Sequence, residues 1–109
     1  MRLEIRTDGV DFVVSRVPEP KSDGEGGQKA DRATGALLFS TELVAMDDSG
    51  AEVIKVTTAG AAPEVGKRQM VHVVGLVAVP WAIDGRSGVA FRADSISPVK
   101  AGARAGAAA

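Results

Sequence analysis

Short runs of alternating and β-branched residues constrain the fold of this chain more than any other feature. The clearest run is 70–79, which reads MVHVVGLVAV, and Gly, Asp, Ser and Pro separate it from similar runs. Residues of this kind at a period of two favour strands. No segment carries the apolar stripe at a period of 3.6 residues that an amphipathic helix needs. The sequence therefore predicts an all-β protein.

The expected strands fit one small barrel. They are 2–6 continuing into 10–17 across a bend at Asp8-Gly9, then 36–46, 52–58, 70–79 and 89–96. The turn 47–50 makes the second and third strands a hairpin, and 81–88 is expected to be a polar turn. Gly75 is expected to mark a bulge or a close approach of backbone in the fourth strand. A five-stranded OB-fold-like barrel satisfies this pattern, and so does an SH3-like barrel.

The chain is expected to form one domain over 1–98, because its 109 residues are about one domain's length. Residues 18–34 combine Pro, Gly and charged residues without periodicity, which predicts a long mobile loop. Residues 99–109 are rich in Ala and Gly, which predicts a disordered tail.

Catalysis and metal binding find little support in the sequence. The chain contains no cysteine and a single histidine, His72, which stands between valines in an expected strand and has no Ser-containing elbow to serve. Asp47 and Asp48 fall in a hairpin turn, where Asp side chains bond to the backbone. We therefore expect no enzyme activity, no cofactor and no metal. No targeting or membrane-spanning segment is recognisable, so a cytoplasmic protein without membrane contact is expected.

Charge is unevenly distributed along a chain whose formal net charge is only −1. Residues 1–48 carry six basic and ten acidic side chains, whereas 49–109 carry seven basic and four acidic ones. The second half could therefore provide a local positive surface, although ordinary surface charge would give the same asymmetry.

Residues 63–96 contain recognisable features in a fixed order. Glu64-Val65-Gly66-Lys67-Arg68 leads into the run 70–79 with its central Gly75, followed by Trp81, by 84–88 (Asp-Gly-Arg-Ser-Gly) and by Phe91-Arg92-Ala93. This order resembles the second half of the single-stranded DNA-binding OB-fold family. In that family a Trp-bearing strand end, a Gly-containing loop and a last strand with an aromatic residue follow a similar strand. The chain also resembles small proteins of actinobacterial integrative and conjugative elements.

The resemblance implies single-stranded DNA binding without strong sequence preference, in replication or transfer of a mobile genetic element. Its partners would be single-stranded DNA, with RNA as an alternative, and further copies of the same chain. The aromatic faces that it implies for stacking bases are Trp81, Phe39 and Phe91. The cations that it implies for the phosphates are Arg32, Lys55, Lys67, Arg68, Arg86 and Arg92.

A second interpretation uses the same residues differently. Phe39 and Phe91 also suit a barrel core, and Lys67 and Arg68 also suit a solvated turn. The chain would then be a protein-interaction or regulatory β-barrel module that does not bind nucleic acid. The direction of the rings separates the two interpretations. An exposed Trp81 beside Arg and Lys favours DNA, whereas buried rings and a long uncovered apolar edge favour a protein partner.

Overall fold

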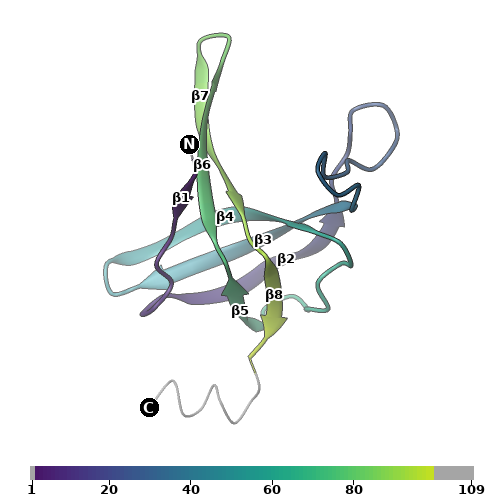
Figure 1. Cartoon of the computed structure of the whole chain (residues 1–109). Helices are drawn as coiled ribbons and strands as arrows, with labels where there is room; N and C mark the ends of the chain where they lie inside the picture. Colours follow the sequence, from purple (N-terminus) through teal and green to yellow (C-terminus); the bar gives the residue numbers. More distant parts are fainter. Residues whose placement is uncertain (1, 100–109) are drawn as a thin grey trace.

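The computed structural model describes residues 2–99, and within them the chain forms eight strands and no helix (Figure 1). The strands are β1 (Leu3–Glu4), β2 (Asp11–Pro20), β3 (Leu38–Asp47), β4 (Gly50–Ala59), β5 (Met70–Val74), β6 (Val77–Ile83), β7 (Arg86–Arg92) and β8 (Ser95–Pro98). The prediction of an all-β protein is confirmed. The described part of the chain has no helix that could cross a membrane.

β2, β3 and β4 form an antiparallel meander in the middle of the sheet. β3 and β4 pair without interruption from Leu38↔Ala59 to Asp47↔Gly50. A side chain closes their turn, because Asp47 Oδ1 accepts a hydrogen bond of 2.9 Å from the backbone N–H of Ser49. This bond is the one that favours Asp at the start of tight turns. The hairpin expected from the sequence is therefore present.

The second half of the described chain is one long hairpin that bends. β6 pairs with β7, and β5 pairs with β8 beyond the bend. Gly75 lies at the bend with a φ of 69°, and a Cβ at this position would collide with the side chain of Asp94. Only glycine adopts this positive φ without strain and has no Cβ to collide with Asp94.

The bend lets the long hairpin border the meander on both sides. β7 pairs in parallel with β4, whereas β5 pairs antiparallel with β2. The strand order is therefore β1-β6-β7-β4-β3-β2-β5-β8, and the sheet is curled (Figure 1). The structure has eight strands in place of the expected five because three of the expected strands are each divided in two.

The core lies on the inner face of the curled sheet. Leu43 of β3 is fully buried and packs with Phe12 and Val14 of β2 and with Val56 of β4. Complete burial of such a side chain contributes about 1.5–3 kcal/mol relative to leaving it exposed. Alternation along β3 therefore fixes its register, since a slip of one residue would turn this set of side chains to the solvent.

The expectation of one bent strand over 2–6 and 10–17 is wrong. β1 pairs with β6, whereas β2 pairs with β3 and β5. The chain reverses between them in a tight turn, in which the N–H of Val10 donates to the carbonyl of Thr7 at 3.1 Å. Glycine at position 9 has a φ of 78° and allows this turn in place of a gentle bend.

The expected polar turn over 81–88 is also wrong. β6 continues to Ile83 and β7 begins at Arg86, so the turn consists of Asp84 and Gly85 alone. These two residues have φ values of 50° and 77°, as in the two-residue turns that match the twist of a hairpin. Pro80 lies inside β6, opposite Val89. Proline is tolerated there because β1 covers the other edge of β6 only at Val77 and Ala78.

The loop between β2 and β3 spans 21–37, since 18–20 still belong to β2. Two isolated bridges tie it together, Ser22↔Gln28 and Ala30↔Leu37. The N–H of Leu38 also donates to the carbonyl of Lys29 at 2.9 Å. The mobility expected for 18–34 stays a prediction. Beyond Val99, the expected tail lies outside the described residues.

Two buried hydroxyls generate a prediction about stability. Thr41 Oγ1 and Thr58 Oγ1 have no hydrogen-bond partner within residues 2–99. Thr41→Val should raise the free energy of unfolding by about 1–2 kcal/mol, because a methyl group of the same shape replaces an unpaired buried hydroxyl. Urea denaturation measures the change. Thr57→Val is the matched control, since Thr57 Oγ1 accepts a hydrogen bond from Lys21 and should show no gain. A loss of stability in Thr41→Val would contradict the prediction.

Candidate nucleic-acid interface

A groove opens where the 21–37 loop, β4 and the β6–β7 hairpin meet, with a cavity volume of about 460 Å³. Its cationic side chains are Lys21, Lys29, Arg32 and Arg92, its one carboxylate is Asp31, and its apolar surface includes Leu38, Val79 and Ala90. We call this site the basic groove. Four positive charges around one negative charge leave it with a surplus of positive charge, which attracts anionic ligands.

Lys21 shows the effect of this surplus. Its Nζ donates to Thr57 Oγ1 at 3.2 Å, which holds the ammonium group against β4. Burial lowers the pKa of Lys21 below its ordinary value, and the positive charges of Lys29 and Arg92 lower it further. An anion bound in the groove would relieve this repulsion.

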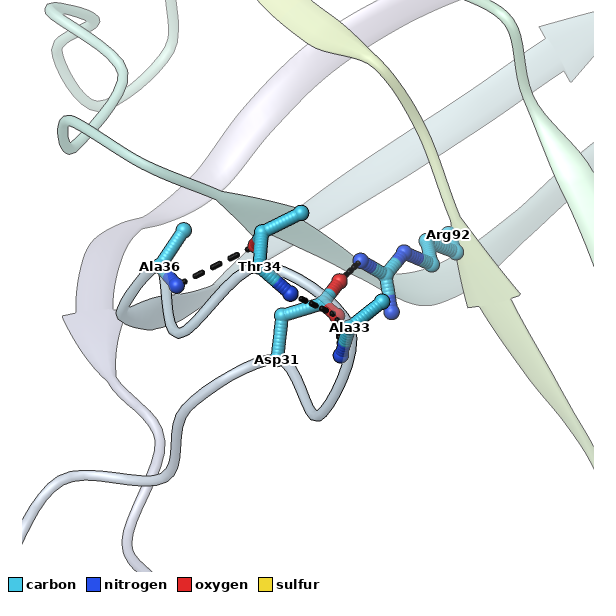
Figure 2. A network of polar contacts seen from close by, with 5 residues as sticks. All are labelled: Asp31, Ala33, Thr34, Ala36 and Arg92. Atoms are coloured by element: carbon cyan, nitrogen blue, oxygen red, sulfur yellow. Dashed lines mark hydrogen bonds and ion pairs between the residues drawn. The ribbon is translucent and has the colours of Figure 1, made fainter.

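Asp31 connects the loop to the sheet (Figure 2). One carboxylate oxygen, Oδ2, forms an ion pair with Arg92, while Oδ1 accepts hydrogen bonds from the N–H groups of Ala33 at 2.7 Å and Thr34 at 3.4 Å. The pKa of Asp31 is lowered, first by the N–H of Ala33 and then by the guanidinium group of Arg92. The side chain of Asp31 is only 15% exposed, whereas that of Arg92 is 37% exposed.

The β6–β7 hairpin projects beyond the rest of the sheet, and we call it the arm (Figure 1). Strand pairing puts Val77, Val79, Trp81 and Ile83 on one face of the arm with Arg86, Gly88, Ala90 and Arg92. Val79, Ala90 and Arg92 also line the basic groove. The same face therefore runs from the groove to the tip of the arm.

Trp81 lies in the middle of this face and is 42% exposed. Its ring covers Gly88, the residue opposite, because a Cβ on Gly88 would lie 2.7 Å from the ring atom Cζ2. This contact holds one side of the ring against the backbone and leaves the ring accessible. A fixed, accessible aromatic face is what a nucleobase needs for stacking.

The structure brings some of the predicted site residues together. Arg32, Arg92 and Phe91 line the basic groove, and Trp81 and Arg86 lie on the connected face of the arm. Phe91 borders the groove, but it is half-buried and packs against the core, and alternation along β7 points its side chain to the face opposite Arg92.

Other predicted site residues lie elsewhere. Phe39 is half-buried and alternation puts it on the core-facing side of β3, with Thr41 and Leu43. Lys55 is exposed on β4 opposite Glu42. Lys67 and Arg68 lie in the connection between β4 and β5 and do not line the groove.

Sequence reasoning missed Lys21, Lys29 and Asp31, which line the groove. All three belong to the loop over 18–34, where the absence of periodicity predicts mobility and gives no direction for any side chain. The usable signal is the order of charges, since Lys29, Asp31 and Arg32 stand almost together in the longest loop. A charged loop beside a barrel strand is a common place for binding residues.

No group of three or more His, Asp or Glu side chains that could hold a metal ion occurs within residues 2–99. His72 is exposed in β5, opposite Ser97.

The lowered pKa of Asp31 predicts an acid-sensitive contact. Unfolding returns this carboxyl to its ordinary pKa of 3.8, so on acidification the unfolded state takes up the proton first. The stability that the ionised carboxylate contributes is therefore lost as the pH falls through 3.8 and further below it. Asp31→Asn should lose less stability over this range than the parent protein. The loss should not disappear, because the pKa values of Asp23 and Asp47 are also lowered. Urea midpoints at several pH values measure it, and equal slopes in both proteins would contradict the prediction.

Comparisons with known proteins return no relative. No family model, no curated protein and no solved structure matches this chain. A binding function for the basic groove and the arm is therefore proposed from the chemistry of their own residues.

Proposed function

We propose that this chain is an OB-type barrel that binds single-stranded DNA along the basic groove and the connected face of the arm. One observation carries the proposal: the exposed ring of Trp81 shares one face of the arm with Arg92, and Arg92 also lines the basic groove. Single-stranded nucleic acid is bound by this combination, a positive groove for the backbone and an aromatic face for the bases.

The strand pairing supports the OB interpretation. If β5 with β6 and β7 with β8 are each counted as one bent strand, five strands remain beside the short β1. OB-folds bind oligonucleotides on the face of their second and third strands and with the loops after the first and fourth strands. In this count those loops are 21–37 and the tip of the arm, Asp84-Gly85. The basic groove lies between the 21–37 loop and the base of the arm.

The chemistry of the groove favours a single strand without strong sequence preference. Lys and Arg contacts to phosphates carry no sequence information, and a stacked ring accepts any base. A base inside a duplex cannot stack on Trp81. One ring and a few cations give modest affinity, so we expect several copies of the chain to act on one strand. The setting that we propose, replication or transfer of a mobile genetic element, follows from the sequence resemblance.

A protein partner is the second candidate, and the exposed apolar residues of the arm favour it. Ile83 is 58% exposed and Val89 is 51% exposed, and they lie on opposite faces of the arm. An isolated two-stranded ribbon is marginally stable in water, so a projecting arm with apolar residues on both faces suits a bound partner. In that case the arm would bind a protein and the groove would bind no nucleic acid.

The ring of Trp81 gives the first test of DNA binding. Trp81→Ala should weaken binding of a labelled oligo-dT by about 1–3 kcal/mol, because one stacking face is lost. Fluorescence anisotropy measures the affinity, and quenching of the Trp81 emission in the parent protein gives an independent signal. Val89→Ala is the matched control, since it truncates an exposed side chain on the other face of the arm. Equal affinity of Trp81→Ala and the parent protein would remove the ring from the site.

The cations of the groove give the second test. Lys29→Gln and Arg32→Gln should each weaken oligo-dT binding and flatten the slope of log K against log salt by about 0.7, the value expected for one phosphate contact to a single strand. Lys67→Gln is the control, because Lys67 lies outside the groove. Oligo-rU and duplex DNA, measured in parallel, test the preference for DNA and for single strands. A salt slope that Lys67→Gln changes as much as Lys29→Gln would contradict the proposed location.

A further inference from the structure

We propose that the guanidinium group of Arg92 is a binding site for a phosphate group, and that the carboxylate of Asp31 occupies this phosphate site in the free protein. A phosphodiester entering the basic groove would exchange with Asp31 on Arg92. The inference rests on the proposed function, because it names the carboxylate that a nucleic-acid phosphate would have to displace from Arg92.

The two oxygens of Asp31 have separate partners, and this separation makes the exchange possible. Oδ2 pairs with Arg92, while Oδ1 holds the turn of the loop through the N–H groups of Ala33 and Thr34 (Figure 2). The turn has further support, because Thr34 Oγ1 accepts a hydrogen bond of 3.2 Å from the N–H of Ala36. Asp31 can therefore leave Arg92 without unfolding the turn that carries it.

The two partners differ in how firmly the backbone holds them. Arg92 pairs with Val77 of β6 and with Thr57 of β4, so strands on both sides fix its Cα. Asp31 lies in a loop outside the strands, where backbone hydrogen bonds with Gly35 and Ala36 and the bridge Ala30↔Leu37 hold the turn. The phosphate site is therefore fixed on the sheet, whereas the carboxylate that competes with phosphate for Arg92 lies on a loop and can move.

The surroundings of Arg92 favour replacement of the carboxylate by another anion. Lys21, Lys29 and Arg32 line the same groove, and Arg2 lines an adjoining depression with Arg92, Asp31 and Asp94. A phosphodiester has a carboxylate's single negative charge, and its two free oxygens can pair with the guanidinium group in a forked geometry, whereas Asp31 uses Oδ2 alone. A phosphate on Arg92 would also meet the neighbouring lysines, which Asp31 alone does not neutralise.

Asp31→Asn tests the proposal directly. The Asn oxygen can still accept the hydrogen bonds from Ala33 and Thr34, whereas the charge that competes for Arg92 is gone. Oligo-dT should bind this variant roughly two- to fivefold more tightly than the parent protein, the range expected for release of one partly exposed ion pair. Asp23→Asn is the matched control. Asp23 belongs to the same loop and caps a turn through the N–H groups of Glu25 and Gly27, but it does not line the groove.

A double-mutant cycle assigns the gain to Arg92. Asp31→Asn should give no gain in oligo-dT affinity when it is introduced into Arg92→Gln, because the phosphate site is then absent. Sodium pyrophosphate is the second probe, and the NMR signal of the Arg92 side-chain N–H monitors its binding. Pyrophosphate should also bind Asp31→Asn more tightly than the parent protein. Equal gains in Asp31→Asn and Asp23→Asn, or a gain that persists without Arg92, would overturn the proposal. If pyrophosphate binds the variants with the expected differences in affinity but oligo-dT binds none of them, the phosphate site is supported and the proposed function is contradicted.

Discussion

The structure depends on the bend at Gly75, which lets one long hairpin pair with both sides of the meander. Without it, β5 could not reach β2 while β7 reaches β4. The parallel contact is short, with two residue pairs, Val56↔Phe91 and Thr57↔Arg92. It joins distant parts of the chain and therefore requires that the bent hairpin be formed. The bend also puts Arg92 beside Thr57, and both residues line the basic groove.

A binding site on this fold divides its tasks between rigid and movable parts. The sheet supplies Arg92 and Thr57, whose backbones are fixed by strand pairing, whereas the 21–37 loop supplies Lys21, Lys29 and Asp31. Lys21 lies at the junction, since its ammonium group donates to Thr57 Oγ1. Charges that face one another across such a junction can adjust to a ligand more cheaply than charges on two strands, because only the loop has to move.

The shape of the arm is not explained by burial of its side chains in the core. β6 and β7 have seven residues each, and beyond their pairs with β1 and β4 they project as a ribbon with exposed apolar side chains. Trp81 stabilises the ribbon by covering Gly88, where a larger residue opposite would displace the ring. The same contact holds the ring in one orientation, so the interaction that stabilises the arm also prepares the face that we propose for a base.

The sequence by itself determined the all-β class, the β3–β4 hairpin and the special role of Gly75, because period-two alternation and turn residues act locally. It missed the length of the arm, since the Asp84-Gly85 turn was included in a longer polar segment around Trp81. Only the tertiary structure decided which charges meet. Arg92 and Asp31 are far apart in the chain, and nothing in the local pattern of either one points to the other. Their contact depends on the curl of the whole sheet, which strand pairing between distant segments creates.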